Sequence, residues 1–532
     1  MAKRMKTAAA GLAAAMAVVS LTACSSGGND NGNAASSPAA GASASAGASP
    51  SQGEKLKPVT LRFYFPGDKP QETDEVWNYV SELTKDTLNA KFEINFVNWN
   101  DYMDKMKLLQ SSGDDYDLNF DANWEDFSNA MNRGGYLDIT DLLPKYAPTL
   151  YKEYTDNNLL DPIKVNGRVY AAPWTVKKTS KPIVWYRGDL AKKGGYGKDK
   201  VETVEDLDAM LHAIKKASPQ IIPFSFRPGT WFNDIDRVFQ EKYGYEDLNF
   251  HGLVVKIDDP KHTVIPWEQT EAFKEYVSYM KKWNEDGIIP KNLLATKGTE
   301  GDFGAGTFGS AINQIDGGIL ENPHPFKPEV EAQGAIKTWS EFYPDNKWVL
   351  DSPLGNAVAI NKNAANPERA LMFLEQLSTN EKLYDAVVYG IVDKTYKLNG
   401  DVVSYMPGQG NGNPTNYLDW SGQWGFWRTE FQKQDSQHTA NYYKQYNDFI
   451  DRPNNIVSTV NYFVPDQTNI KTEAAKREQV LSELGQLLMT GINVKDVDKG
   501  VNDFIAKEKD AGTDKIVAEV QKQLDAFMAK QG

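Results

Sequence analysis

The sequence predicts an α/β protein with two lobes. The chain has 532 residues, which is more than one hydrophobic core usually organises. Hydrophobic residues make up 40% and charged residues 24% of the chain, which is the balance of an ordinary globular protein. Residues 59–120 alternate between the two-residue period of strands and the 3.6-residue period of helices. Size and alternation together favour two lobes and a mostly parallel sheet with helices on its faces.

The start of the chain resembles a secretory signal that ends at a lipoprotein cleavage site. Three basic residues precede a short apolar run over residues 8–21, which then reads Leu21-Thr22-Ala23-Cys24. Cys24 is the only cysteine of the chain. The resemblance to the lipobox of bacterial lipoproteins implies that residues 1–23 are removed and that the sulfur of Cys24 carries a fatty acid. A plain secretory signal with an incidental cysteine is the alternative.

A disordered tether is predicted behind this cysteine, so that residues 24–53 form the lipidated end and its linker. Residues 25–53 consist almost wholly of Ser, Gly, Ala, Asn and Pro, which cannot bury enough apolar surface to offset chain entropy. By random-coil scaling they would span roughly 30 Å. That reach would lift a folded domain off the membrane.

The folded part begins near Lys57 with alternating strands and helices. Val59 to Phe65 reads as a strand that Pro66-Gly67 closes. The pattern then predicts a helix over 76–87, a strand over 91–98, a helix over 102–109 and a strand over 116–120. This βαβαβ order predicts parallel pairing.

Later elements are predicted from local signals. Residues 183–186 and 356–360 read as strands, and residues 273–283 as an amphipathic helix. Thr203-Val204-Glu205-Asp206 resembles a capping box before a helix, and Asn366-Pro367 has the cap and first-turn residues of another. Asn399-Gly400 between two apolar segments indicates a hairpin, and the chain looks helical from about Thr472 to its end.

Charge and motifs argue against several function classes. Without residues 1–23 the formal charge is about −17, which is unsuited to nucleic acid or to lying flat on anionic lipid. The chain contains no GxxxxGK[ST] phosphate loop, no HExxH zinc helix and no GxSxG nucleophile elbow, and its five histidines lack ligand spacing. We therefore expect no metal, no cofactor and no enzyme activity, and these absences favour a binding protein over an enzyme.

Aromatic residues next to polar ones are abundant, with 13 Trp and 25 Tyr in the chain. A sugar ring has an apolar face of C–H groups and a rim of hydroxyls, so tryptophan beside Asp, Asn or Gln suits a sugar site. Core packing is the alternative for any single tryptophan. Such clusters occur at residues 99–101, 121–124, 173–174, 229–233 and 419–427.

The chain resembles the extracellular solute-binding proteins of ABC importers, in the sugar-binding group that includes maltose-binding protein. It looks most like the large lipoproteins of this group in Gram-positive bacteria. The likeness rests on residues 117–124 and 135–143, on a first hinge crossing at 165–173 and 183–190, and on a second at 356–360 with 366–370. It implies two α/β lobes of the periplasmic-binding-protein type, with a hinge and an interlobe cleft. Lobe 1 would take residues 54–172 and 357–405, and lobe 2 would take 173–356 and 406–532.

The resemblance also implies the ligand-binding residues. Asp121, Asn123 and Trp124 follow the strand at 116–120, and Trp174 and Lys177 follow the first crossing. A Phe-x-x-Gly-Thr-like stretch at 303–307 precedes two further candidates. The remaining candidates are Asn313 and Gln314 after that stretch, Trp420 and Trp424 in the last aromatic cluster, and Trp231 in the cluster at 229–233.

The resemblance implies a monomer, tethered outside the cell membrane, that delivers a carbohydrate to ABC permease subunits. The carbohydrate is expected to be an oligosaccharide. The alternatives are a binding protein for another solute such as a peptide or polyol, a tethered glycoside hydrolase, and a surface lectin. A hydrolase would need two carboxylates across the cleft, one with a raised pKa.

Overall fold

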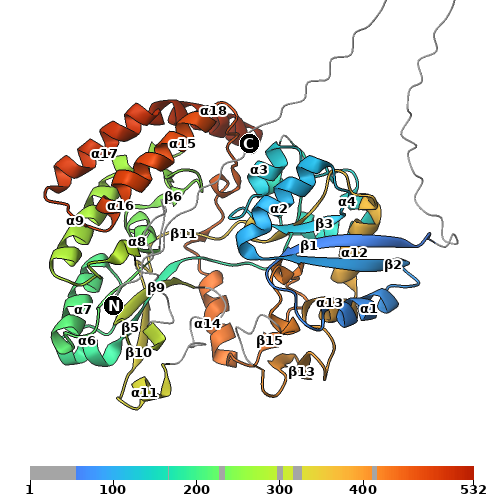
Figure 1. Ribbon diagram of the computed structural model, residues 1–532, viewed down its shortest axis with the longest axis horizontal. Helices are drawn as coiled ribbons and strands as arrows, with labels where there is room; N and C mark the ends of the chain where they lie inside the picture. The colour runs from blue at the N-terminus through green and yellow to red at the C-terminus, as the bar shows by residue number, and fades with distance from the viewer. Residues whose placement is uncertain are drawn as a thin grey trace, which may run out of the picture. The chain divides into compact units, whose positions relative to one another are not determined.

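The computed structural model (Figure 1) describes residues 56–165, 167–226, 234–295, 303–315, 326–409 and 416–531. The expected signal, Cys24 and tether lie outside these residues, as does Trp231. Residues Lys55–Gly532 form one compact unit, to which all the described residues belong.

The largest sheet contains the predicted parallel strands (Figure 1). β1 (Val59–Pro66) pairs in parallel with β2 (Ala90–Val97) on one side and with β3 (Leu118–Asp121) on the other. The connections are α1 (Thr73–Leu83) and α2 (Trp99–Ser112), as the alternating periods predicted. Because every second side chain of β1 points to one face, Leu61, Phe63 and Phe65 are fully buried.

The remaining strands depart from the mostly parallel sheet that the sequence predicted. β12 (Ala357–Ile360) returns antiparallel to β3, and β4 (Ala172–Pro173) pairs antiparallel with β12, so the order is β2-β1-β3-β12-β4. A second sheet is wholly antiparallel, with β5 (Pro182–Arg187) between β10 (Lys337–Glu341) and β9 (Ser310–Gln314). The βαβαβ pattern covers only the start of the chain, so it could not show these later pairings.

Short strands form three smaller sheets. The first is β6 (Tyr245–Asp247), β7 (Leu253–Lys256) and β8 (Ile265–Pro266); the second is β13 (Tyr396–Asn399), β14 (Val402–Tyr405) and β15 (Gln434–Asp435); the third is β11 (Trp348–Val349) and β16 (Asn455–Ile456). Gly400 joins β13 to β14 with φ +59°, which confirms the predicted hairpin.

Helices cover both main sheets. Besides α1 and α2 they are α3 (Phe127–Asn132), α4 (Leu143–Tyr146), α5 (Pro148–Asp156), α6 (Gly188–Gly194), α7 (Val204–Ala217), α8 (Asp234–Tyr243), α9 (Glu271–Glu285), α11 (Pro328–Glu331), α12 (Pro367–Thr379), α13 (Glu381–Val388), α14 (Ala440–Ile450), α15 (Lys471–Val480), α16 (Gln486–Met489), α17 (Val497–Ala511) and α18 (Thr513–Gln531). Short helical turns are η1 (Asp161–Ile163), η2 (Trp267–Gln269), η3 (Leu293–Ala295), η4 (Pro353–Gly355), η5 (Tyr417–Asp419), η6 (Gln423–Phe426), η7 (Val460–Tyr462) and η8 (Leu481–Gly485). None of the helices within the described ranges is long and apolar enough to cross a bilayer.

Two large hydrophobic cores correspond to the two main sheets. The first core combines β1, β3 and β12 with α1, α12 and α13, and the second combines β5 with α7, α8 and α9. Tyr417, Trp420 and Phe426 pack in the first core. These three residues fall in the range 406–532 that was expected for lobe 2, so the chain stays with the first core beyond residue 405.

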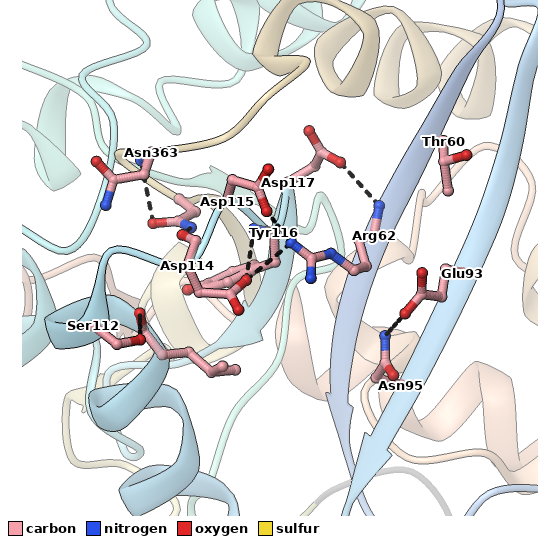
Figure 2. Close-up of polar contacts among 12 residues, drawn as sticks. Thr60, Arg62, Glu93, Asn95, Ser112, Asp114, Asp115, Tyr116, Asp117 and Asn363 are labelled. Atoms are coloured by element: carbon pink, nitrogen blue, oxygen red, sulfur yellow. Dashed lines mark hydrogen bonds and ion pairs between the residues drawn. The ribbon is translucent and has the colours of Figure 1, made fainter.

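A polar cluster joins β1 to the start of α12, and Figure 2 shows its part around Arg62, Asp114, Asp115 and Asp117. The buried carboxylate of Asp117 accepts hydrogen bonds from the backbone N–H of Arg62 at 2.9 Å and from that of Asn366 at 2.8 Å. The guanidinium of Arg62 reaches Asp114 and Asp115. Asn366 was expected to cap α12, but its side chain makes no capping hydrogen bond. Its backbone N–H instead anchors the helix to β3 through Asp117.

The C-terminal helices are held to the second core by a buried arginine. α15, α17 and α18 lie together (Figure 1), and the fully buried guanidinium of Arg477 in α15 binds Glu268 of η2 through two 2.9 Å hydrogen bonds. The same guanidinium donates to Glu508 of α17 and to Thr513 of α18, each at 2.9 Å. Pairing of this kind compensates for the loss of hydration of the buried charges.

Candidate functional site

A cavity of about 420 Å³ lies between residues from both cores, and we call it the first cavity. Its walls come from the loop after β3, the segment after β4, α8 with β6, and β11 with the segment after it. The lining residues used below are Asn123, Trp124, Trp174, Lys178, Ser180, Arg237, Gln240, Glu241, Glu246, Asp247, Lys347, Trp348 and Asp351. A cavity of this volume is within the range of small-molecule binding sites.

The first cavity has an exposed aromatic wall. The Trp124 side chain is 52% exposed, and its indole Nε1 donates to the carbonyl of Gly355 at 2.6 Å. That bond fixes the ring, because the indole nitrogen is its only polar atom. Trp174 is almost fully buried and stacks on Trp427 with ring centroids 6.0 Å apart. Trp124 therefore offers a flat apolar face to a ligand, while Trp174 closes the wall behind it.

Three buried polar side chains in the same cavity have atoms without a hydrogen-bond partner among the described residues. These atoms are Nε2 of Gln240, Oε2 of Glu241 and Oε1 of Glu246. The residues are 5%, 3% and 8% exposed, respectively. An unpaired buried polar atom costs about 1–3 kcal/mol, so native proteins nearly always give it a partner. A ligand with both hydroxyl donors and acceptors would supply that partner.

The carboxylates of the first cavity are held in a low-polarity environment. Burial raises the pKa of Glu241 to about 8, against the opposing effect of Lys181, with which Glu241 forms a buried ion pair. Burial also raises the pKa of Glu246 to about 7, although its Oε2 accepts a 2.6 Å hydrogen bond from Ser458. Asp351 accepts hydrogen bonds from the backbone and hydroxyl of Ser180, and burial raises its pKa as well.

Opposite charges balance across the first cavity. Three basic side chains line it, against four carboxylates, and one of the carboxylates is paired with a lysine just outside the lining. The ion pairs among or next to the lining residues are Lys181–Glu241, Arg237–Asp247 at 4.0 Å and Lys347–Asp258. No group of three or more potential metal ligands occurs within the described part of the chain. The first cavity is therefore suited to a neutral polar ligand.

Three of the residues expected from the sequence meet in the first cavity, namely Asn123, Trp124 and Trp174. Two others, Lys177 and Trp424, line a second cavity that Lys178 connects to the first. Asn313 and Gln314 lie in β9, where Asn313 pairs with Ile183 and Gln314 with Pro182. The Gln314 side chain and the whole of Trp231 lie outside the described residues.

Asp121 and Trp420 lie behind the cleft surface. Trp420 is 1% exposed in the first core, and its Nε1 donates to the carbonyl of Val387 at 3.1 Å. Asp121 is buried, accepts hydrogen bonds from Tyr136 and from the backbone of Ala122 and Asp126, and has a pKa raised by burial to about 7. Both residues therefore support the fold of this region: Asp121 shapes the loop that presents Trp124, and Trp420 packs the core.

Gln240, Glu241 and Glu246 were not predicted from the sequence as site residues. They lie on α8 and β6, and a polar helix residue in a sequence is normally solvent-exposed. Gln240 and Glu241 also directly follow Phe239, an apolar residue that packs in the second core. Only the packing of α8 against the cleft turns these polar side chains into buried ones.

Comparison with known proteins identifies relatives over most of the chain. The family model of the bacterial extracellular solute-binding proteins matches residues 78–403, and a domain of unknown function, DUF3502, matches residues 459–529. A carbohydrate ABC transporter substrate-binding protein of Streptococcus pneumoniae is 27% identical over 481 residues, which cover 89% of this chain and 91% of the relative. The fructooligosaccharide ABC transporter substrate-binding protein FusA of the same species is 27% identical over 237 residues, which cover 40% of this chain and 43% of FusA.

Solved structures support the same fold. The N-glycan transport solute binding protein NgtS from Streptococcus pneumoniae superposes with a TM-score of 0.71 at 23% identity, covering 90% of this chain and 100% of NgtS. The alginate-binding protein AlgQ2 superposes with a TM-score of 0.62 at 20% identity, covering 88% of this chain and 98% of AlgQ2. These likenesses confirm the two-lobed fold that the sequence predicted. Because the family model covers more than half of its length, the chain belongs to the bacterial extracellular solute-binding proteins.

Proposed function

We propose that the protein binds a carbohydrate in the first cavity and delivers it to the permease of an ABC importer. The observation that carries the proposal is the pairing, in one cavity, of the exposed Trp124 ring with the unpartnered buried atoms of Gln240, Glu241 and Glu246. A sugar ring can stack its C–H face on an indole and pair its hydroxyls with amide and carboxylate groups. A relative that is a carbohydrate ABC transporter substrate-binding protein agrees with this chemistry.

Both lobes would contact the ligand. Asn123 and Trp124 follow a strand of the first core, whereas Gln240 and Glu241 belong to a helix of the second core. A ligand that contacts both sides favours the closed arrangement, because its differential affinity shifts the population of open and closed states. We place lobe 1 at residues 54–172 and 357–405 together with about 417–427, and the remaining folded residues in lobe 2.

The binding residues form two groups in this proposal. Asn123, Trp124, Trp174, Gln240, Glu241 and Glu246 contact the ligand in the first cavity, and Lys177 and Trp424 contact it in the second. Asp121 and Trp420 act through the positions of their neighbours. Ligand contacts by Trp231, Asn313 and Gln314 stay predictions.

We also propose that the protein acts outside the cell as a lipid-anchored monomer. Cys24 would carry the lipid, and residues 25–53 would separate the folded lobes from the membrane. Replacing the cysteine in Cys24→Ala should release the protein into the medium or leave its signal uncleaved. Unchanged fractionation of that variant with the membrane would contradict the anchor.

The proposed function is tested by thermal melting in the presence of a panel of mono- and oligosaccharides. A true ligand must raise the melting temperature further as the ligand concentration increases, because binding stabilises the folded state by RT ln(1 + [L]/Kd). A panel that produces no shift at millimolar concentrations, while peptides or polyols do, would assign the site to another solute. Release of products from a sugar that binds would indicate a glycoside hydrolase, whereas we expect the sugar to be recovered intact.

A further inference from the structure

A second, larger cavity of about 1230 Å³ adjoins the first. We call it the second cavity; it lies among the segment after β4, the aromatic segment around Trp424 and Trp427, and α14. Its volume exceeds the range of a typical small-molecule site. In the function proposed above, only Lys177 and Trp424 of this cavity contact the ligand, and the rest of its lining has no assigned role.

A stacked pair of indoles separates the two cavities. Trp174 lines the first cavity, Trp427 lines the second, and their rings stack with an interplanar angle of 21°. Lys178 lines both cavities, with its ammonium 5.4 Å from the Trp174 ring and 5.0 Å from the Trp427 ring. The boundary between the cavities is therefore aromatic and positively charged at one point, which is no barrier to a neutral polar chain.

A second row of indoles runs between the same two cavities. The Trp99 ring lies 6.0 Å from that of Trp124, which lines the first cavity, and 6.1 Å from that of Trp424, which lines the second. Trp99 is 37% exposed and Trp424 is half-buried. The Trp99 and Trp424 planes lie at 20° and stack on each other, so the row forms one continuous aromatic strip along which an extended ligand can lie.

The charge of the second cavity selects against acidic sugars. Its carboxylates outnumber its lysines, and one lysine, Lys433, is already paired with Glu381 at 2.7 Å and with Asp385 at 3.2 Å. A uronic acid unit in this cavity would face like charges, which lowers affinity. The lining carboxylates are Glu153, Asp419, Glu430, Asp435 and Asp451.

We propose that the second cavity continues the carbohydrate site, so that the ligand is a neutral oligosaccharide that occupies both cavities and passes Lys178 between them. The inference rests on the proposed function and adds the length and charge class of the ligand. It predicts that affinity rises with chain length up to the length that fills both cavities. It also predicts that this rise in affinity depends on contacts in the second cavity alone.

The test uses a bulky residue to fill the second cavity from its exposed edge. Asn447 of α14 is exposed and lines this cavity, whereas Gln445 on the same helix is exposed and does not. Asn447→Trp should therefore obstruct the second cavity, and Gln445→Trp is its matched control. Asn157→Trp obstructs the same cavity from the end of α5 and provides a second variant if the first does not fold.

The affinities of these proteins are measured by calorimetric titration with neutral oligosaccharides of two to seven units. The oligosaccharides come from the sugar series that raises the melting temperature of the parent protein most. For the parent protein, the longest ligand should bind at least about tenfold more tightly than the disaccharide. Asn447→Trp should remove this gain in affinity with chain length and keep the affinity for the disaccharide. Gln445→Trp should keep the gain with chain length and the affinity for the disaccharide. Alginate oligomers of equal length should bind at least about tenfold more weakly than the neutral chains.

Each other outcome has a distinct meaning. Equal affinity for short and long neutral chains, or a length gain that survives in Asn447→Trp and Asn157→Trp, overturns the extended site. Alginate oligomers that bind as tightly as neutral ones overturn the neutral class. If no oligosaccharide of any length binds the parent protein, the proposed function itself fails.

Discussion

Trp124 and Trp420 illustrate how burial divides similar residues between binding and folding. Both belong to aromatic clusters with polar neighbours in the sequence, but Trp124 is 52% exposed in the first cavity and Trp420 is 1% exposed in the first core. An exposed ring contributes to affinity when a ligand covers it. A buried ring contributes to stability through the contacts that it makes with the core.

The two tryptophans should therefore respond differently to truncation. Trp124→Ala should weaken carbohydrate binding by about 1–3 kcal/mol with little change in the free energy of unfolding. Trp420→Ala should lower the free energy of unfolding by about 3–5 kcal/mol, because it leaves a large void in the first core. Titration calorimetry and denaturant unfolding of both variants measure these effects. Early unfolding of Trp124→Ala with native affinity would place that ring in the core instead.

Gln240 should show the reverse relation between binding and stability. Its buried Nε2 has no partner among the described residues, so Gln240→Leu removes an unsatisfied donor and should keep or raise the melting temperature of the free protein. The same change removes a hydrogen bond to the ligand and should weaken binding about tenfold or more. Melting curves with and without saturating sugar measure both effects. Equal stabilisation of the two proteins by the sugar would exclude Gln240 from the site.

Glu246 should make stability depend on pH. Its pKa is about 7 in the folded protein, raised by burial and by neighbouring Asp247 against the hydrogen bond from Ser458, compared with a usual value of 4.5. Between these values the unfolded chain has lost the proton while the folded protein keeps it, so stability falls as pH rises. The loss reaches about 3 kcal/mol by pH 8.

The variant Glu246→Gln removes this contribution. Its free energy of unfolding should fall less between pH 5 and pH 8 than that of the parent protein, measured by denaturant titration at both values. Glu329→Gln, at an exposed position of α11, is the control and should follow the parent protein. Parallel pH profiles for parent and Glu246→Gln would contradict a raised pKa at Glu246.

Among the secondary-structure elements, the junction of β1, β3 and α12 depends on one buried carboxylate. Asp117 accepts hydrogen bonds from the backbone N–H of Arg62 in β1 (Figure 2) and from that of Asn366 before α12. Asp117→Ala should lower the free energy of unfolding by about 2–4 kcal/mol, because it leaves two amides unsatisfied. Asp115→Ala is the control: its side chain is 65% exposed, so losing the contact to Arg62 should cost at most about 1 kcal/mol. Similar losses in both variants, measured by denaturant unfolding, would contradict an anchoring role for Asp117.

Elements defined by local chemistry were predictable from the sequence. The alternation of Leu61, Phe63 and Phe65 predicted β1, and Thr203 caps α7 by accepting from the backbone N–H of Asp206 at 3.1 Å, as the capping box predicted. Both features depend on residues within a few positions of each other. The antiparallel pairing of β12 with β3 was not predictable in this way, because it joins segments more than two hundred residues apart.

The candidate site was predictable only in part for the same reason. Asn123, Trp124 and Trp174 follow strands of the first sheet, where the carboxyl ends of strands form ligand crevices. Gln240 and Glu246 belong to a helix and a strand whose burial depends on packing between distant segments. The same dependence on packing between distant segments explains why Trp420 lies in the core, although its segment combines aromatic and polar residues as a sugar site would.

At the scale of the whole molecule, the first cavity lies between residues of the two cores, which close on the ligand in the function proposed here. Residues of the first cavity come from the loop after β3 on one side and from α8 on the other. A sugar that contacts both groups gains affinity only in the closed state, so binding should shift the population toward that state. A rigid surface lectin would bind without such a shift.

The most direct test is small-angle X-ray scattering of the protein with and without the sugar that shifts its melting temperature most. The account predicts a smaller radius of gyration at saturation with that sugar, and no change with a sugar that leaves the melting temperature unaltered. A radius of gyration that stays constant while calorimetry shows the sugar bound would contradict the claim that the two lobes close on a shared ligand.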